Sequence, residues 1–222
     1  MSGIDDMMRS VADRPPAASP TGEPFVLASS SPRRRQLMEA AGDAFTIVVA
    51  DDSAECGICS RETAPELVAR YAYRKAVSVA GKIDDGLIIA ADTVASCNGQ
   101  ILGKPHDVDH AAEMLRMLSG RRHDVYTGVA LWSRRTSRCV VDVVRVELEM
   151  DTITAPMLDD YLRSMKWEGK AGAFGFQDGN DWLHIVCGGS PTAVVGLPME
   201  RLSELLENFD SISRKVDHRV ND

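Results

Sequence analysis

The sequence predicts an α/β fold in which helices flank a central sheet. Between residues 25 and 209, apolar strand-like runs alternate with segments of helical periodicity, which favours an α/β architecture over an all-β sandwich. Residues 87–91 form a continuous apolar run, which is typical of a strand buried on both faces of a sheet. The chain of 222 residues is long enough for one large domain or two small lobes, and we expect one domain.

Both ends of the chain are predicted to lie outside this domain. Residues 1–24 contain recurrent prolines among small and polar residues, which indicates a mobile extension. This extension lacks the apolar segment of a secretory signal, and its acidic residues are uncommon in transit peptides. Residues 210–222 are predicted to be a loose C-terminal tail. The predicted domain therefore covers residues 25–209.

The first strand–helix junction carries positive charge at an unusual place. An apolar strand over residues 25–28 leads into three serines, after which Ser31 suits an N-cap and Pro32 suits the first helical position. The helix therefore begins at the arginines of residues 33–35. A helix start is already partly positive, so each uncompensated cation costs about 0.3–1 kcal/mol. The junction predicts a phosphate site, with a solvated basic turn as the alternative.

A second strand and a long helix follow. Residues 45–50 are predicted to form the strand, which Asp51 and Asp52 follow directly. A helix is predicted over residues 64–80, where apolar residues recur at helical spacing. A proline lies near the start of this helix, and a glycine follows its end. Lys75 lies on or beside the apolar face of this helix.

Asp92 comes shortly after the buried run of residues 87–91. A carboxylate in that position costs several kcal/mol unless it is paired, binds a metal or is reached by solvent. We therefore expect a cleft at the end of this strand. A capping aspartate is the alternative explanation.

The Asn-Gly dipeptide at residues 98–99 predicts a two-residue hairpin turn. In the resulting register Thr93 lies opposite Lys104, so that Asp92 and Lys104 become near neighbours. Strict alternation would place Asp92 and Lys104 on opposite faces of the sheet. We therefore expect a bulge or twist at Gly103.

The remaining elements continue the alternation of strands and helices. They are predicted as helices over residues 107–118, 156–165 and 198–209, and strands over residues 125–132, 139–148 and 182–187. Residues 167–177 lie between the last two of these helices, are rich in glycine and end in Gln177. Glycines permit a ligand to approach the backbone closely, but they serve equally well in a mobile surface loop.

Composition narrows the classes of ligand and partner. The formal net charge of -8 disfavours nucleic-acid polymers and acidic membranes, so the arginines suit a small anionic ligand. Five scattered cysteines indicate a reducing compartment, which we expect to be the cytoplasm, and Cys56 and Cys59 lack the second pair typical of a zinc site. The phosphate-binding motif G-x-x-x-x-G-K-[ST] is absent. The histidines are expected on the surface or behind a site rather than as catalytic bases.

Six motifs occur in order along the chain. They are Ser29-x-Ser31-Pro32-Arg33-Arg34, Ala91-Asp92-Thr93, Gly99-x-x-Leu102-Gly103-Lys104-Pro105, Leu118-Ser119-Gly120-Arg121-x-His123-x-Val125-x-Thr127-Gly128-Val129, Lys170-Ala171-Gly172-Ala173-Phe174-Gly175-Phe176-Gln177 and Val195-Gly196-Leu197-Pro198. Together they resemble the motifs of the Maf-like nucleoside triphosphate pyrophosphatases. The resemblance spans about residues 25–209 and leaves out only the two ends of the chain.

The resemblance implies hydrolysis of a nucleoside triphosphate to the monophosphate and pyrophosphate, with Mg²⁺ or Mn²⁺ as cofactor. It also implies an elongated Maf/ITPase-like fold, in which a mixed central sheet is flanked by helices and two lobes surround a cleft. Members of the family often form homodimers. The implied substrates are dTTP, UTP and modified pyrimidine nucleotides.

The resemblance also assigns roles to single residues. Asp92 matches the family's catalytic acid/base and metal-site aspartate, while Lys75 and Lys104 match lysines that contact phosphate. The substrate-binding residues implied are Ser29, Ser31, Arg33, Arg34, Thr93 and Gln177. Among these, Arg33, Thr93 and Gln177 resemble the residues that distinguish the subgroup acting on dTTP and UTP, and the glutamine offers both a donor and an acceptor to a pyrimidine edge.

One departure from the family pattern concerns the metal. Family members commonly carry an Asp-Glu pair after the second strand, whereas residues 51–55 read Asp-Asp-Ser-Ala-Glu. Either Glu55 or Asp52 is expected to supply the missing carboxylate beside Asp92. The departure keeps a second hypothesis open, namely a nucleotide-binding regulator of cell division with little turnover. A phosphate-dependent scaffold is a third.

Overall fold

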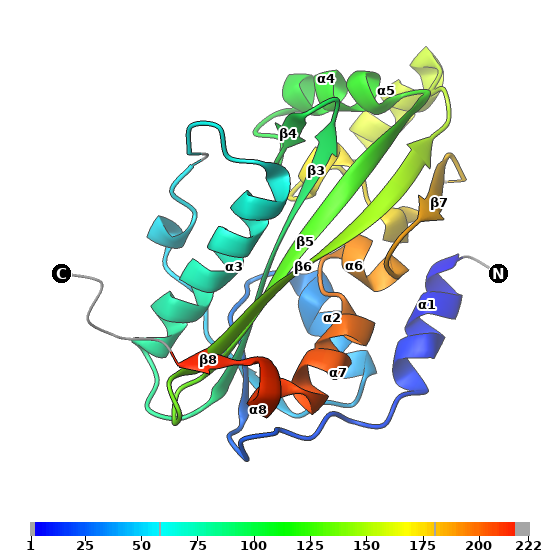
Figure 1. The fold of residues 1–222 in the computed structure, drawn as a ribbon. Coiled ribbons are helices and arrows are strands. Elements are labelled where there is room, and N and C mark those ends of the chain that lie inside the picture. The colour runs from blue at the N-terminus through cyan, green and yellow to red at the C-terminus, as the bar shows by residue number, and fades with distance from the viewer. Residues whose placement is uncertain (1–2, 58, 180, 216–222) are drawn as a thin grey trace.

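The structure is a computed structural model that describes residues 3–57, 59–179 and 181–215 (Figure 1). Its core is an eight-stranded sheet with the order β2-β1-β3-β5-β6-β7, in which β4 pairs with β3 and β8 pairs with β6. The strands are β1 (Phe25–Leu27), β2 (Phe45–Ile47), β3 (Leu87–Cys97), β4 (Gln100–Leu102), β5 (Arg121–Ser133), β6 (Arg138–Met150), β7 (Leu183–Cys187) and β8 (Arg214–Lys215). Strand β1 runs parallel to β2 and β3, and the other pairs are antiparallel. The predicted mixed α/β sheet is therefore confirmed.

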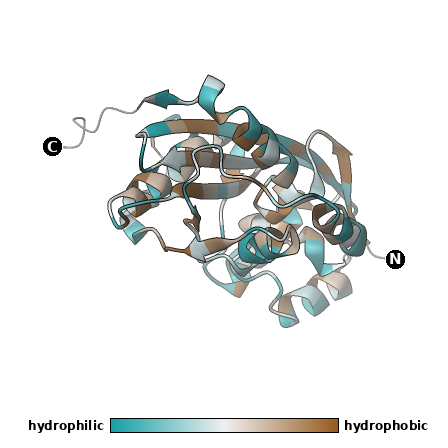
Figure 2. Ribbon diagram, turned by 90° about the horizontal axis from the view of Figure 1, so that it is seen from below, coloured by the Kyte–Doolittle hydropathy of each residue, from teal (hydrophilic) through white to brown (hydrophobic). Residues whose placement is uncertain are grey.

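Helices cover both faces of this sheet, as the alternating pattern predicted. They are α1 (Gly3–Ala12), α2 (Pro32–Ala40), α3 (Ala64–Ala80), α4 (Val108–Leu118), α5 (Ala155–Arg163), α6 (Pro191–Val195), α7 (Met199–Glu207) and α8 (Phe209–Ile212), with single 3₁₀ turns η1 (Asp52–Ala54), η2 (Ala171–Ala173) and η3 (Phe176–Asp178). Helix α3 packs on one face, and the remaining α-helices pack on the other face or at its ends (Figure 1). Hydrophobic residues gather along the central strands (Figure 2).

The face opposite α3 is divided into two lobes. Ile89 and Ala91 of β3 belong to a hydrophobic cluster with α1, α2 and α7, whereas Ala95 belongs to a second cluster with α4 and α5. Between them on the same face of the sheet lie two threonines, Thr93 and Thr127, which pair across β3 and β5. The hydrophobic core is therefore interrupted by a polar seam at the middle of β3.

The edge of β3 is open at this seam. Strand β5 pairs with β3 along one edge from residue 87 to residue 96. On the other edge β1 pairs with residues 87–89 and β4 pairs with residues 95–97. No described strand pairs with the intervening stretch on that edge, so Asp92 and Thr93, which point to opposite faces, are both accessible from it.

The hairpin differs from its predicted form. The Asn-Gly turn and the pairing of Cys97 with Gln100 are confirmed, and the ladder continues only to the pair Ala95 and Leu102. Strand β4 ends there, so Lys104 leaves the ladder and does not lie opposite Thr93. The bulge expected at Gly103 is not needed, because the chain is no longer bound by strand alternation when it reaches Lys104.

The helix predicted over residues 64–80 matches α3 at both ends, because a capping box at Thr63 and Glu66 fixes its start. The second strand is shorter than predicted and ends at Ile47, from which point the chain turns toward η1. Apart from such boundaries, the order and type of the elements predicted above for residues 25–209 are confirmed, and α6 is a helix that the sequence did not predict.

The N-terminal extension differs from the expectation of a mobile segment. Residues Gly3–Ala12 form helix α1, and Met7 and Val11 are buried in the cluster that includes α2 and α7. The prolines that suggested mobility follow this helix and carry the chain back to β1. The composition of the helix is only weakly apolar, but its apolar residues lie on one face, which packs on this cluster.

The C-terminal tail is ordered for part of its length. Helix α8 is followed by β8, which pairs with Arg138 and Cys139 of β6. Residues 216–222 lie outside the described residues, so for them the prediction of a loose tail is not tested. In the part of the chain that the structure describes, no helix is long and apolar enough to span a membrane.

Candidate active site

The largest concentration of predicted site residues lies around the open edge of β3. A cavity of about 640 Å³ is located there, between the end of β1, the start of α2 and the glycine-rich segment of residues 168–177. All ten predicted site residues line this cavity. They are Ser29, Ser31, Arg33, Arg34, Glu55, Lys75, Asp92, Thr93, Lys104 and Gln177. The fold thus brings together residues from the whole length of the domain.

The start of α2 faces this cavity, as the sequence predicted. Ser31 is the N-cap residue, yet its hydroxyl makes no capping hydrogen bond, and Pro32 occupies the first turn. The backbone N–H of Ser31 donates to Ser29 Oγ at 3.2 Å. The first turn contains no acidic residue that would offset its positive end. The helix start therefore suits a bound anion.

Arg34 connects the start of α2 to the polar seam. Its Nε donates to Gly196 O at 2.7 Å, and its terminal nitrogens donate to Ser29 Oγ at 3.2 Å and Thr93 Oγ1 at 3.3 Å. Burial lowers the pKa of Arg34. The negative charges of Asp92 and Glu55 oppose this effect, and the positive charge of Arg33 adds to it. Arg34 thus serves first as an anchor for Thr93, and its charge remains at the edge of the cavity.

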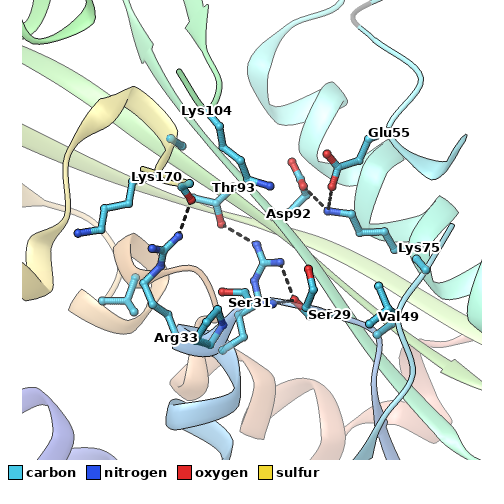
Figure 3. Close-up of a pocket in the computed structure, with 18 of the residues that line it drawn as sticks. Ser29, Ser31, Arg33, Val49, Glu55, Lys75, Asp92, Thr93, Lys104 and Lys170 are labelled. Atoms are coloured by element: carbon cyan, nitrogen blue, oxygen red, sulfur yellow. Dashed lines mark hydrogen bonds and ion pairs between the residues drawn. The ribbon is translucent and has the colours of Figure 1, made fainter. Parts of the chain in front are cut away.

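Arg33 extends to the other side of the cavity. Its guanidinium donates to Gly169 O at 2.8 Å, which connects α2 to the glycine-rich segment (Figure 3). Burial lowers the pKa of Arg33, while the nearby Asp178 and Tyr161 oppose this effect. Two neighbouring arginines of one helix thus hold two different segments of the chain.

An ionic centre lies on the α3 side of β3. Lys75 Nζ lies 2.5 Å from Asp92 Oδ1 and 2.6 Å from Glu55 Oε1, and both carboxylates point toward it (Figure 3). Lys75 and Asp92 are buried, and the Glu55 side chain is 43% exposed. Asp92 is thus a paired carboxylate at a cleft, as the sequence predicted, and not a cap.

A glycine on β5 allows α3 to reach this centre. Gly128, the cross-strand partner of Asp92, lies so close to α3 that a Cβ atom on it would be 2.3 Å from the carbonyl oxygen of Val68. The helix therefore lies almost on the strand at this point. This close approach brings Lys75, two turns further along α3, to the level of Asp92.

The structure places Glu55 rather than Asp52 in the centre. Glu55 follows η1 and contacts Lys75, while Asp52 lies on the cavity wall within η1. Burial would raise the pKa of Glu55, but the hydrogen bond and charge of Lys75, with Lys104 and Arg34 beyond it, outweigh burial and lower the pKa. Glu55 is therefore a carboxylate at neutral pH.

These carboxylates fit a metal that arrives with a phosphorylated ligand. Among the described residues, no three His, Cys, Asp or Glu side chains are grouped closely enough to hold a metal. Asp92 and Glu55, however, lie on either side of Lys75 Nζ, which contacts one oxygen of each, so that a metal would bind beside this lysine. Mg²⁺ usually takes one or two carboxylates and completes its shell with phosphate oxygens and water. The donor set is thus suited to Mg²⁺ or Mn²⁺ shared with a substrate.

The glycine-rich segment forms the wall opposite this centre. Gln177 lies in η3 and lines the cavity, and Lys104 is an exposed residue on the rim between the two walls. Thr93 Oγ1 hydrogen-bonds to Thr127 Oγ1 at 3.0 Å, and Thr127 donates to Ala193 O at 2.8 Å. The threonine pair thereby holds α6 against the seam.

Two charged residues of this wall were not predicted from the sequence to belong to the site. Lys170, which lines the cavity, forms a buried ion pair at 2.5 Å with Asp178, the residue next to Gln177 in the chain. The available signal was a lysine and an aspartate at the two ends of a glycine-rich segment. Sequence reasoning had no means of showing that the segment folds back so that its ends meet.

His123 is not part of the ionic centre. It is buried, and its ring packs edge-on against Phe174 with centroids 5.2 Å apart. Burial lowers its pKa, which favours a neutral ring. Because Phe174 lines the cavity and His123 packs behind it, the expectation that histidine supports the site from outside is confirmed for this residue.

Comparisons with known proteins agree with these observations. A protein of Rhodopirellula baltica named dTTP/UTP pyrophosphatase is 63% identical over 96% of this chain and 93% of its own length. Proteins of the same name from Clostridioides difficile and Pelotomaculum thermopropionicum are 37% and 40% identical, over 85% and 83% of this chain respectively and 96% of their own lengths.

A solved structure of a nucleoside-triphosphatase (dITP/XTP pyrophosphatase) from Mycobacterium abscessus is 15% identical, covers 85% of this chain and 96% of its own, and has a TM-score of 0.39. That likeness is too weak to bear on the activity. The family described as Maf-like protein matches residues 24–209, which is the whole of the predicted domain. The chain therefore belongs to the Maf-like family.

Proposed function

We propose that this protein hydrolyses nucleoside triphosphates to the monophosphate and pyrophosphate, with dTTP and UTP as its substrates. The observation that carries the proposal is the ionic centre of Asp92, Glu55 and Lys75, which opens into the same cavity as the arginine-bearing start of α2. Relatives that carry the name dTTP/UTP pyrophosphatase match 96% and 85% of this chain, which supports the same reaction.

The residues of the centre suit attack by water on the α-phosphorus. A bond forms between the water oxygen and the α-phosphorus, the bond to the bridging oxygen of the β-phosphate breaks, and pyrophosphate leaves. Asp92 would accept the proton of the attacking water. Lys104 and the arginines supply positive charge where the leaving pyrophosphate gains negative charge. Mg²⁺ or Mn²⁺, held by Asp92 and Glu55, would neutralise further phosphate charge when bound.

The opposite wall suits recognition of the base. Gln177 has a carbonyl acceptor and two N–H donors, which together complement the edge of uracil or thymine. Arg33 connects this wall to the helix start through Gly169, and Thr93 occupies the seam between the two walls. We propose that Gln177, Arg33 and Thr93 select the pyrimidine, and that modified pyrimidine nucleotides are accepted as well.

Pyrophosphate release from a panel of nucleoside triphosphates tests the reaction. The wild type is expected to release pyrophosphate from dTTP and UTP with Mg²⁺ or Mn²⁺, and to lose this activity in EDTA. Asp92→Asn is expected to lose about a hundredfold or more in kcat, because the amide does not accept the proton. Asp160→Asn, at an exposed aspartate of α5, is the matched control. Full activity of Asp92→Asn would refute the assigned role.

Substitution of Gln177 tests the base-reading role. Gln177→Glu replaces the amide donors by an acceptor of negative charge, so kcat/KM for dTTP and UTP is expected to fall. Equal rates of the variant and the wild type on both nucleotides would reject this role.

The regulator hypothesis makes a different prediction for the same panel. A regulator would bind nucleotides and release no pyrophosphate from any of them. This hypothesis was motivated by residues 51–55, which lack the adjacent Asp-Glu pair of the family. Glu55 nevertheless contacts Lys75, so a glutamate from this segment is present in the ionic centre. We therefore favour the enzyme. A homodimer and a cytoplasmic location remain proposals, supported by the family resemblance and the cysteine content.

A further inference from the structure

A buried group of charged and polar residues lies within the wall proposed to recognise the base. Lys170 Nζ donates to both carboxylate oxygens of Asp178, at 2.5 and 2.6 Å, and Tyr161 of α5 donates its hydroxyl to Asp178 Oδ2 at 2.8 Å. The side chains of Lys170 and Asp178 are only 10% and 8% exposed. The carboxylate thus holds the two ends of the glycine-rich segment to each other and to α5.

The segment between these ends wraps closely around the ion pair. A Cβ atom on Gly175 would lie 2.6 Å from Lys170 Nζ and 2.7 Å from Asp178 Oδ2. The backbone of Gly175 has an ordinary negative φ, so a side chain there would be disfavoured only because the ion pair would have to shift to make room for it. The path of the segment that bears Gln177 is therefore defined by the ion pair.

The same carboxylate balances two cations. Burial lowers the pKa of Lys170, and the charge of Asp178 opposes this effect. Asp178 also attracts Arg33, which holds Gly169 next to Lys170. In Figure 3, Arg33 and Lys170 lie on the side of the cavity opposite Lys75 and Glu55. Without Asp178, Arg33 and Lys170 would both lose the carboxylate whose charge acts on them.

Buried ion pairs contribute little net stability, since the cost of desolvation offsets their attraction, and hydrophobic replacements are often as stable. Their better-supported role is to select one arrangement of the chain. We propose that Asp178 is a positioning residue for base selection, which fixes the Gln177 turn and Arg33 in one arrangement through Lys170 and Tyr161. This inference rests on the proposed function, because it assumes that Gln177 reads the base.

Kinetics of three single variants on dTTP and on the purine nucleotide dGTP test this role. Asp178→Asn keeps the shape of the side chain and removes its charge, so KM for dTTP is expected to rise about tenfold or more through misplacement of the turn. The change in kcat is expected to be small, and the preference for dTTP over dGTP should fall with the rise in KM. Tyr161→Phe removes one hydrogen bond, and a rise in KM of about two- to tenfold is expected.

The control is Asp160→Asn, which removes an aspartate that is 74% exposed and pairs with Arg163 on the surface of α5. It is expected to match the wild type in KM and in base preference. A merely structural role of Asp178 would lower the fraction of active enzyme, and thus the apparent kcat, with KM and preference unaltered. That result, or an unaltered KM in both Asp178→Asn and Tyr161→Phe, would overturn the proposal.

Binding separates this proposal from the proposed reaction. If the wild type releases no pyrophosphate, the reaction is refuted, and the affinity for dTTP measured by calorimetry takes the place of KM. A loss of dTTP affinity of about tenfold in Asp178→Asn, with dGTP affinity unaltered, would then support the positioning role. Equal dTTP affinity of wild type and variant would overturn it. If Asp178→Asn does not fold, the milder Tyr161→Phe decides the question by the same measurements.

Discussion

Substitution of Gly128 tests whether the close approach of α3 to β5 positions the ionic centre. In Gly128→Ala, the added Cβ atom would lie 2.3 Å from Val68 O, 2.5 Å from Val68 C and 2.9 Å from Ala69 N. Ordinary carbon–oxygen contacts are about 3.3 Å or longer. Since all three atoms belong to the backbone of α3, no side-chain rotation relieves the clash. The helix must move by about 1 Å, with Lys75 two turns further along it.

The displacement has consequences for both stability and activity. Overpacking of this kind costs about 1–3 kcal/mol. For a chain of this length that corresponds to a fall in Tm of about 2–12 °C. Lys75 Nζ lies 2.5 Å from Asp92 Oδ1, so a shift of α3 lengthens this contact and changes the placement of the carboxylate. A misplacement of about 1 Å can lower kcat/KM about a hundredfold.

Thermal unfolding and pyrophosphate release are the two assays. Gly81→Ala is the matched control, because a Cβ atom there, at the end of the same helix, meets its first neighbour at an ordinary 3.6 Å. Its Tm and kcat/KM are expected to be close to those of the wild type. Unaltered Tm in Gly128→Ala would refute the clash, and a lower Tm with unaltered kcat/KM would refute the coupling of α3 to the centre.

Two further predictions concern the N-terminal helix and the ionic centre. Val11→Asp places a carboxylate at a fully buried position of α1 and is expected to lower the free energy of unfolding by about 2 kcal/mol or more, whereas Ser10→Asp on the exposed side should have little effect. Equal denaturant midpoints of the two variants would indicate that α1 does not pack on the domain. Because the pKa of Glu55 is lowered in the folded state, its ionised form stabilises the fold above the unfolded pKa of about 4.3, and this contribution is lost as the pH falls through the lowered value. The difference in Tm between wild type and Glu55→Gln should therefore be present at pH 7 and shrink in acid; a constant difference would contradict the assigned pairing with Lys75.

Several features of the site follow from local sequence alone. The serines, proline and arginines at the start of α2 define a positive helix end wherever the helix is placed, because capping and charge act within one turn. Asp92 follows an apolar run and could be recognised as a carboxylate that requires a partner. The ends of α3 were predictable for the same reason, since its caps are local.

Other features depended on the packing of distant segments. The predicted hairpin register was wrong beyond Leu102, because the turn fixes only the residue pairs next to it. Leu102, where β4 leaves β3, packs in the lobe that α4 and α5 form. The choice of Glu55 over Asp52 depended on where η1 meets α3. Helix α1 has a composition typical of a mobile segment, and only the cluster that receives Met7 and Val11 stabilises it.

The sequence by itself determined which chemical groups are present, which segments become strands and helices, and to which family the motifs correspond. Only the tertiary structure decided that β1 and β4 leave the edge of β3 open between them, that Lys75 pairs with both Asp92 and Glu55, and that Lys170 meets Asp178. The periodicity of apolar residues indicates which side of a helix or strand is buried. It does not record which element covers that side, because this depends on register and close approach between segments far apart in the chain.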